Sequence, residues 1–266
     1  LKLTICPDVL KEQADQLRIV YTPLNGCGNI PVRTVLERLG IRHVKVVEEQ
    51  EAPDGRFPTC PSPNPEEPAA WEYAMRTAKE YDADLVIATD PDSDRLGVQA
   101  KDPKTGEYVL FTGNMTGVLM AEYILNALAA RHTLPKDGIL MSTVVSSPMG
   151  RLIAGEYGCA FGETLTGFKY IGEQMRIFEE QGTPSFVFGY EESYGCLGGT
   201  YARDKDAVVS SMLICQMAAY HKNNGRTLVD ALNNIYAKFG FYLDALDTFV
   251  LKGKDGAEKI QSIMTN

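Results

Sequence analysis

The chain has 266 residues, 44% of them hydrophobic, and a formal net charge of −9. This length predicts one large or two medium domains with real cores, and the acidic balance argues against a nucleic-acid partner, whose phosphates would be repelled. No segment approaches the roughly 18 apolar residues of a membrane span, and the six cysteines form no CxxC pair, so we expect no membrane partner, no zinc site and a reducing, cytoplasmic location.

The first part of the chain has the pattern of a parallel sheet that begins with a strand, a helix and a second strand. Residues 17–22 and 44–47 are apolar and rich in β-branched side chains, which indicates strands. Between them, apolar residues after Pro31 repeat with helical spacing. The glycine-containing turn at 23–28 is either purely structural or a cradle for phosphate. The structural interpretation is favoured because the turn lacks the spacing of known phosphate-binding loops.

A proline-rich segment and a helix lead to the most informative stretch of the sequence. Six prolines between residues 53 and 68 exclude a helix or a central strand there. A helix is expected over residues 69–81, followed by a buried strand that begins at residue 85. Pro91 ends that strand because it has no backbone N–H to donate to a neighbouring strand of the sheet.

Three carboxylates alternate directly after this strand, at Asp90, Asp92 and Asp94. Side chains beyond the carboxyl end of a strand in an α/β sheet lie where such sheets bind ligands. Crowded carboxylates repel one another unless a cation neutralises them, and Mg²⁺ prefers oxygen ligands of this kind. Arg95 adds a guanidinium suited to phosphate. The pattern therefore predicts a magnesium site beside a phosphate group.

The sequence after residue 89 can be compared with two other kinds of metal-binding loop. An EF-hand loop that began at Asp90 would need glycine and glutamate where Arg95 and Lys101 stand, so this type is excluded. A haloacid-dehalogenase-type phosphatase would use Asp90 as its nucleophile and Asp92 as its acid, but Asp94 stands where that motif has a threonine or valine. This phosphatase stays as the alternative interpretation.

The second half of the chain repeats the α/β pattern after a turn at residues 102–106. Expected strands lie at 138–145, 159–161 and 185–189, and expected helices at 114–130, 148–157, 206–222 and 227–239. A further helix is expected to follow the segment 164–169 and to end at residue 180. The predicted fold class is therefore α/β, with two tandem domains whose mixed, mostly parallel sheets are flanked by helices. We expect the domains at residues 1–107 and 108–245, and a linker at 246–266.

A second polar loop follows the expected strand at 185–189. Glu191 and Ser193 are two residues apart in this loop, so in an extended backbone their side chains point the same way. A carboxylate beside a hydroxyl suits the neighbouring hydroxyls of a sugar, although an acidic surface turn has the same letters. Further on, the run at residues 203–206 is either a charged helix start or a cationic group near a phosphate.

Taken together, these motifs resemble those of the α-D-phosphohexomutases, which include phosphoglucomutase and phosphomannomutase. The tyrosines near the second loop resemble the phosphoglucomutase and phosphopentomutase branch most. The matching segments are residues 90–95 (DPDSDR), 189–195 (GYEESYG), 21–26 (YTPLNG), 62–66 (SPNPE), 164–169 (TLTGFK) and 203–206 (RDKD).

The resemblance implies a fragment of a magnesium-dependent phosphosugar mutase, which covers the second and third of the family's four domains. It implies that Asp90, Asp92 and Asp94 hold Mg²⁺ and that Arg95 and Lys205 lie near the reacting phosphate and hydroxyl. The implied contacts to the sugar phosphate are Glu191, Ser193, Thr166, Gly167, Lys169 and Arg203.

Two parts of the family pattern are absent from these letters. No serine matches the family's phosphoserine loop, since Ser62 falls in the proline-rich motif of the second domain, and no segment matches the family's final phosphate-binding loop. We therefore expect a piece of a longer chain, whose own missing domains are its partners together with a hexose or pentose phosphate. A non-catalytic sugar-phosphate-binding module is the remaining alternative.

Overall fold

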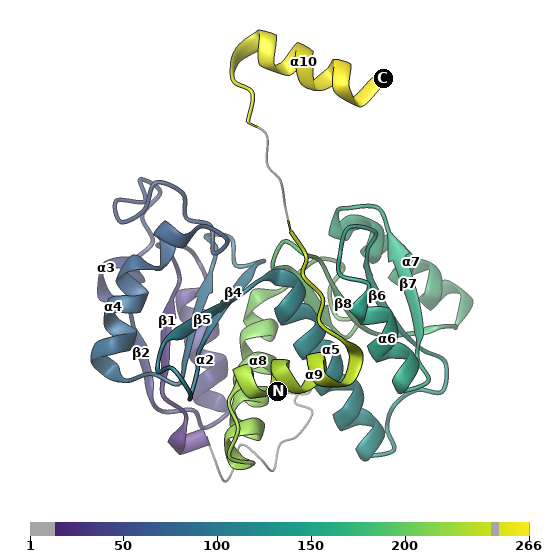
Figure 1. The fold of residues 1–266 in the computed structure, drawn as a ribbon, viewed down its shortest axis with the longest axis horizontal. Helices are drawn as coiled ribbons and strands as arrows, with labels where there is room; N and C mark the ends of the chain where they lie inside the picture. Colours follow the sequence, from purple (N-terminus) through teal and green to yellow (C-terminus); the bar gives the residue numbers. More distant parts are fainter. Residues whose placement is uncertain (1–13, 246–249, 266) are drawn as a thin grey trace.

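The computed structural model describes residues 14–245 and 250–265. Its main body consists of two α/β units that lie side by side, each built on one sheet of mixed strands (Figure 1). This confirms the predicted fold class. None of the helices in the described part of the chain combines the length and the apolar character that a membrane crossing requires.

The first sheet has five strands in the order β2-β1-β3-β4-β5. The strands β1, β2 and β3 are parallel to one another, whereas β4 and β5 are added in antiparallel hairpins. Their bounds are β1 Ile19–Thr22, β2 Val44–Val46, β3 Leu85–Thr89, β4 Leu96–Lys101 and β5 Tyr108–Phe111. The central strand β3 is buried along its whole length, as its continuous apolar run predicts.

Helices cover both faces of the first sheet because its strands carry apolar side chains on both faces. Val86 and Ala88 of β3 pack in one core with Trp71 and Ala74, while Leu85 and Ile87 join the core on the opposite face. The helices of this unit are η1 Ala14–Gln16, α2 Asn29–Arg38, α3 Glu48–Glu51, η2 Pro68–Trp71 and α4 Glu72–Tyr81.

The second sheet has four strands in the order β7-β6-β8-β9, of which only β9 is antiparallel to its neighbour. The strands are β6 Gly138–Thr143, β7 Ala160–Thr164, β8 Ser185–Tyr190 and β9 Cys196–Gly198. The helices are α5 Gly113–Ala130, α6 Met149–Glu156, α7 Phe168–Gln181, α8 Ala207–Asn223 and α9 Leu228–Phe239. A further helix, α10 Gly253–Thr265, stands apart from both units (Figure 1).

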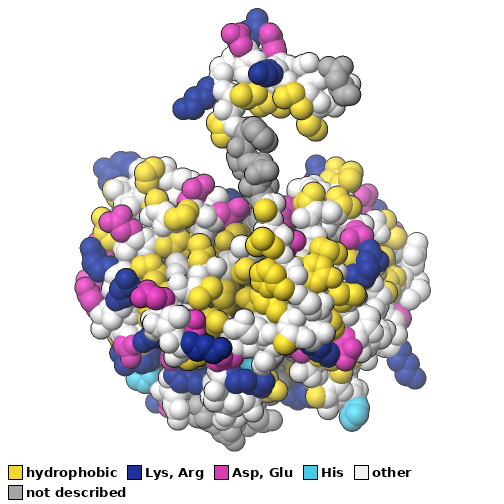
Figure 2. All heavy atoms as spheres, viewed as in Figure 1, with side chains coloured by type: hydrophobic (Ala, Val, Ile, Leu, Met, Phe, Trp, Pro, Cys, Tyr) yellow, Lys and Arg dark blue, Asp and Glu magenta, His cyan; other side chains and the backbone are white. Residues whose placement is uncertain are grey.

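One hydrophobic core joins the two units. It contains Ile87 of the first sheet and Phe188 of the second, and the helices between them supply the rest, including Leu213 of α8. Helix α8 follows the second sheet in sequence but also packs against α2 of the first unit. Figure 2 shows hydrophobic side chains gathered over the middle of one face, and the segment after α9 carries the exposed Phe241 and Leu243.

The strands β4, β5 and β9 and the helix α10 are not among the elements expected from the sequence. The turn at residues 102–106 connects β4 to β5, so the expected boundary after residue 107 falls inside a hairpin, and the first sheet continues to Phe111. In the expected linker at 246–266, residues 253–265 form α10, which carries the (i, i+4) ion pair of Lys254 with Glu258. Residues 1–13, 246–249 and 266 lie outside the described residues.

A substitution at Gly113, the first residue of α5, tests how tightly the second unit is packed. A Cβ added there would lie 1.9 Å from the carbonyl oxygen of Glu192 and 2.6 Å from the amide nitrogen of Tyr194. Because both contacts are backbone atoms, Gly113→Ala should lower the free energy of unfolding by about 1–3 kcal/mol in urea denaturation. The matched control is Gly155→Ala in α6, where the added Cβ meets no atom within 4 Å. This variant should raise the free energy of unfolding by roughly 0.5–1 kcal/mol. Equal effects of the two variants would contradict the packing described here.

Candidate functional site

Two hairpin loops lie at corresponding places on the two sheets. The aspartate loop, residues 90–95, joins β3 to the antiparallel β4, and the glutamate loop, residues 191–195, joins β8 to the antiparallel β9. Each loop is closed at its base by a backbone hydrogen bond, from the Asp90 N–H to the Arg95 carbonyl at 3.3 Å and from the Glu191 N–H to the Gly195 carbonyl at 2.8 Å. Both loops therefore extend the carboxyl end of a parallel strand, where α/β sheets bind ligands.

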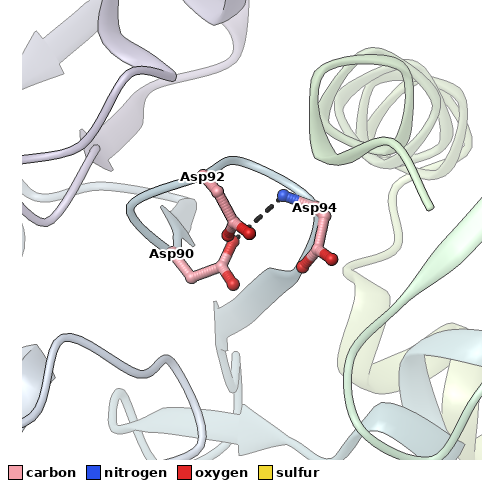
Figure 3. Close-up of side chains that lie close together, drawn as sticks. All are labelled: Asp90, Asp92 and Asp94. Atoms are coloured by element: carbon pink, nitrogen blue, oxygen red, sulfur yellow. Dashed lines mark hydrogen bonds between the residues drawn. The ribbon is translucent and has the colours of Figure 1, made fainter. Parts of the chain in front are cut away.

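The aspartate loop brings its three carboxylates together. One oxygen from each of Asp90, Asp92 and Asp94 lies within 4.8 Å of the others. In Figure 3 the carboxylates of Asp90 and Asp92 lie next to each other, and Asp94 projects from the opposite side of the loop. Ser93, at the tip, has a positive φ of 61°, which turns the chain back so that these side chains can converge. An all-oxygen set of this kind suits a hard divalent cation such as Mg²⁺.

Asp90 is the buried member of this cluster, with 1% of its surface exposed. Its Oδ1 accepts hydrogen bonds from the backbone N–H groups of Asp94 and Arg95, at 3.1 and 3.0 Å, and its Oδ2 accepts one from the Arg95 Nε at 2.8 Å. The pKa of this carboxyl is raised to about 6 as the net result of burial, which is the largest cause, of the hydrogen bonds from Arg95, which lower it, and of the charges of Asp94 and Asp92, which raise it. The charged form of Asp90 is thus held mainly by Arg95.

Two cations flank the aspartates. Arg95 lies against Asp90, and Lys205, from the segment that precedes α8, places its Nζ 2.9 Å from Asp94 Oδ2 and 3.1 Å from Asp204 Oδ1. The Lys205 side chain is only 16% exposed, so its ion pair with Asp94 is screened less than a surface pair. This pair joins the aspartate loop of the first unit to the second unit.

The glutamate loop holds Glu191 at the beginning of α7. The side chain is buried, and its Oε1 accepts a hydrogen bond from the Gly167 N–H at 3.0 Å. Burial raises the pKa of Glu191, and the nearby charge of Lys205 acts in the opposite direction. Ser193 is half-buried in the same loop, and Tyr194 next to it takes a positive φ of 67°, which closes the turn.

Glu192 has a structural role that the sequence did not reveal. Its Oε2 accepts hydrogen bonds from the hydroxyls of Thr143 at 2.7 Å and Ser146 at 3.2 Å, which lie at the end of β6 and just after it. Its carboxylate therefore ties the glutamate loop to the neighbouring strand of the same sheet. The only signal in the sequence was a second carboxylate directly after Glu191, which is equally typical of a solvated surface residue.

The two loops also bind each other through their backbones. Arg95 and Gly195 form an isolated antiparallel bridge, and the Leu96 N–H donates to the Tyr194 carbonyl at 3.0 Å. The first residue of α8, Ala207, donates its N–H to the carbonyl of Ser93 at 3.0 Å. The aspartate and glutamate loops thus form one continuous surface across the junction between the units.

Other segments of the first unit support the aspartate loop from behind. In the turn at 23–28, the Cys27 N–H donates to the Pro91 carbonyl at 2.8 Å, and a Cβ on Gly26 would lie 2.3 Å from Pro91 Cα. These contacts support a structural role for that turn. From the proline-rich segment, Glu66 Oε1 lies 3.4 Å from an Arg95 guanidinium nitrogen. Glu66 therefore helps to hold Arg95, a contact that its sequence position did not indicate.

The structure brings most of the predicted site residues together, although not all of them. Asp90, Asp92, Asp94, Arg95 and Lys205 form one charged cluster, and Glu191 is linked to Gly167, while Ser193 lies in the glutamate loop.

The remaining three predicted residues are more peripheral. Thr166 and Lys169 are exposed, with the Lys169 Nζ 5.0 Å from the centre of the Tyr170 ring. Arg203 is exposed, and its guanidinium pairs with Glu179 of α7 and with the carbonyl of Thr200, 3.0 Å away. The Arg203 side chain is therefore committed to α7 and to its own segment in this conformation.

Comparison with solved structures gives the same fold. A putative phosphomannomutase from Thermus thermophilus aligns with a TM-score of 0.68 at 19% identity, over 90% of this chain and 51% of that one. An Aspergillus fumigatus N-acetylphosphoglucosamine mutase, in complex with GlcNAc-6P and magnesium, aligns with a TM-score of 0.58 at 15% identity, over 87% and 49%. At these identities the likeness concerns the fold alone.

Curated relatives are closer in sequence. A phosphoglucomutase of Staphylococcus haemolyticus is 36% identical over 248 residues, which make up 93% of this chain and 44% of that protein. A phosphoglucomutase of Staphylococcus aureus strain MRSA252 is 37% identical over 251 residues, or 94% and 44%. The chain thus spans less than half the length of the curated relatives that it matches.

Two family models match successive parts of the chain. The model for phosphoglucomutase/phosphomannomutase alpha/beta/alpha domain II matches residues 2–105, and the model for domain III of the same family matches residues 112–239. These segments correspond to the two units described above, each with one of the two loops. The chain therefore belongs to the phosphoglucomutase/phosphomannomutase family, and it contains domains II and III.

Proposed function

We propose that this chain is the metal- and sugar-binding part of a magnesium-dependent phosphosugar mutase. The complete enzyme would move a phosphoryl group between C1 and C6 of a hexose, or C5 of a pentose, through a phosphoserine and a bisphosphorylated sugar. The observation that carries this proposal is the junction of the aspartate and glutamate loops, which sets a cation-binding cluster beside a buried carboxylate. The relatives named phosphoglucomutase support it.

The three aspartates would hold the magnesium ion. Their all-oxygen donor set and the mutual approach of their oxygens fit this metal, and a fold relative from Aspergillus fumigatus was observed with magnesium and a sugar phosphate. When bound, the ion would neutralise charge on the phosphoryl group in transit. Asp92 is the exposed member of the cluster and Asp90 the buried one, so the ion would enter from the side of Asp92.

The two cations of the cluster would act on the reacting groups. The guanidinium of Arg95 is held in place by Asp90 and Glu66. Its N–H groups that do not contact these carboxylates would donate hydrogen bonds to phosphate oxygens. Lys205 lies between Asp94 and Asp204 and would orient the sugar hydroxyl that accepts or releases the phosphoryl group. Preorganised charges of this kind stabilise a transition state without reorganisation at the moment of reaction.

The second unit would position the sugar. Glu191 and Ser193 would accept and donate hydrogen bonds to neighbouring ring hydroxyls, and Glu192 would act as a positioning residue that keeps their loop on β6. Thr166 and Gly167 would line the same site. Lys169 and Arg203 would reach the phosphate only after leaving their present partners, Tyr170 and Glu179.

The phosphoryl donor would come from elsewhere in the complete protein. No serine of this chain matches the family's phosphoserine loop, and the curated relatives are more than twice as long as the matched region. The missing domains of the parent chain are therefore proposed as its partners, together with the phosphosugar. The free thiols of the buried Cys60, Cys159, Cys196 and Cys215 fit a reducing, cytoplasmic setting.

The phosphatase alternative for Asp90 is less well supported. Asp94 stands where the phosphatase motif has a threonine or valine, and both family models that match the chain describe phosphoglucomutase/phosphomannomutase domains. A non-catalytic binding module would keep the same loops without turnover. Assays of the complete protein separate that module from an enzyme.

The proposal is tested by steady-state kinetics of the complete protein with Mg²⁺, a panel of hexose and pentose 1-phosphates, and a bisphosphate activator. Glu191→Gln should lower kcat/KM by about 10- to 100-fold for the true substrate, because the neutral amide accepts a weaker hydrogen bond from the sugar than the buried carboxylate does. The matched control is Glu180→Gln at the end of α7, whose carboxylate pairs with Arg176 on the surface, and it should retain normal kinetics.

The 266-residue chain alone should show no turnover in the same assay, because it lacks the phosphoryl donor. Normal kinetics of Glu191→Gln with every sugar phosphate would remove Glu191 from the site. Release of inorganic phosphate without isomerisation would favour the phosphatase, and binding of substrate by the complete protein without any turnover would favour the binding module.

A further inference from the structure

Residues 62–67 of the proline-rich segment form a fixed support beside the aspartate loop. Pro65 is buried, and its carbonyl accepts a hydrogen bond at 2.8 Å from Nε1 of Trp71, the only tryptophan of the sequence. A Cβ on Gly97 of β4 would lie 2.6 Å from the Cβ of Pro65 and 2.6 Å from the Trp71 ring, so these three residues are in close contact. The ring of Pro65 also fixes its own φ angle. The next residue, Glu66, therefore follows a backbone with little freedom.

A second contact fixes the backbone of Glu66 directly. Its N–H donates to Oδ1 of Asn64 at 3.0 Å, and the following N–H, that of Glu67, donates to the Asn64 carbonyl at 2.9 Å. Asparagine stabilises turns by local hydrogen bonding of this kind. The side chain of Glu66 is thus presented to Arg95 from a rigid turn.

Arg95 forms ion pairs with three carboxylates of the described residues, and Glu66 is the one outside the aspartate cluster. The Arg95 Nε lies 2.8 Å from Asp90 Oδ2 and 3.6 Å from Asp94 Oδ1, and its Nη1 lies 3.4 Å from Glu66 Oε1. Asp90 and Asp94 belong to the set of side chains that could hold a metal ion, whereas Glu66 does not. The guanidinium is therefore shared between two proposed metal ligands and one carboxylate that is not a ligand.

A divalent cation on the aspartates would change this balance. Its two positive charges would offset two of the three negative charges of the cluster, and the ion itself would repel the guanidinium. Glu66 would keep its full negative charge because it is not a ligand. Its pair with Arg95 is partly buried, with 31% and 34% of the two side chains exposed, so salt screens it less than a fully exposed pair.

We propose that Glu66 is a positioning residue whose carboxylate keeps the Arg95 guanidinium in the site when a divalent cation occupies the three aspartates. The proposal rests on the proposed function, because it takes these aspartates as the ligands of the cation. A guanidinium held in this way meets a phosphate oxygen without reorganisation at the moment of reaction. The proline-rich segment then has a task of its own: it is the rigid base that keeps this carboxylate in register with the aspartate loop.

The test follows the side-chain N–H signals of Arg95 by nuclear magnetic resonance, on the ¹⁵N-labelled 266-residue chain near neutral pH. The Arg95→Lys variant identifies these signals because it removes them. Hydrogen exchange between the guanidinium and water is measured without Mg²⁺ and at saturating Mg²⁺. In the unchanged chain the exchange should be slow in both conditions, because Asp90 holds the guanidinium in the first and Glu66 holds it in the second.

Two variants of the segment complete the test. Glu66→Gln should leave the exchange slow without Mg²⁺ and accelerate it about 10-fold or more at saturating Mg²⁺, because the remaining hydrogen bond between charged groups is then lost. The matched control is Glu67→Gln, which removes the same charge from the next residue. Glu67 is exposed and has no ion pair among the described residues, so this variant should behave like the unchanged chain.

Slow exchange in Glu66→Gln at saturating Mg²⁺ would overturn the proposal. Equal acceleration with and without Mg²⁺ would also overturn it, since Glu66 would then have a purely structural role. The backbone amides of residues 90–95 report separately on the metal. If they do not respond to Mg²⁺ in the unchanged chain, the metal site of the proposed function fails together with this proposal, whereas a response combined with slow exchange in Glu66→Gln removes the role of Glu66 alone.

Discussion

The structure depends on one junction, where the aspartate loop of the first sheet is joined to the glutamate loop of the second. Backbone pairing of Arg95 with Gly195 aligns the loops, and the largely buried ion pair of Lys205 with Asp94 crosses between the units. Removing either partner of such a pair leaves an uncompensated charge, which costs more than the pair itself contributes. A site divided between two sheets needs such a junction, because a displacement of about 1 Å between reacting groups is enough to slow a reaction markedly.

The same local design appears twice around this junction. In each unit a buried parallel strand ends in a loop of carboxylates, and an antiparallel strand returns from the loop to the sheet. Because the returning strands β4 and β9 pair along their length, the loops are closed hairpins rather than free connections. Helix α8 then packs against both units and starts at the aspartate loop, where Ala207 donates to Ser93. The shared core behind the loops keeps the two halves of the site together.

The parts of this arrangement that are local in the chain could be predicted from the sequence. The aspartate loop was predicted because a buried strand, Pro91 and three carboxylates lie within one short run of residues, 85–95. The strands β4, β5 and β9 were missed, since short strands that depend on a distant partner carry a weak local signal. The helix expected at 114–130 begins one residue earlier, at Gly113, because the Thr112 hydroxyl caps it by accepting from the Met115 N–H, while the Asn114 side chain accepts from the distant Ser147 N–H. The tethers made by Glu66 and Glu192 arise from tertiary contacts, and no spacing in the sequence indicates them.

The central claim is that metal and sugar ligands belong to one site across two units, and paramagnetic broadening by Mn²⁺ in place of Mg²⁺ tests it most directly. On the ¹⁵N-labelled 266-residue chain, substoichiometric Mn²⁺ should broaden the amides of residues 90–95 and, together with them, those of Gly195 and Lys205 from the second unit. Replacement of all three aspartates by asparagine should abolish both effects, whereas Asp255→Asn in the separate helix α10 should abolish neither. Broadening that stays within the first unit, or that survives the triple replacement, would contradict the account.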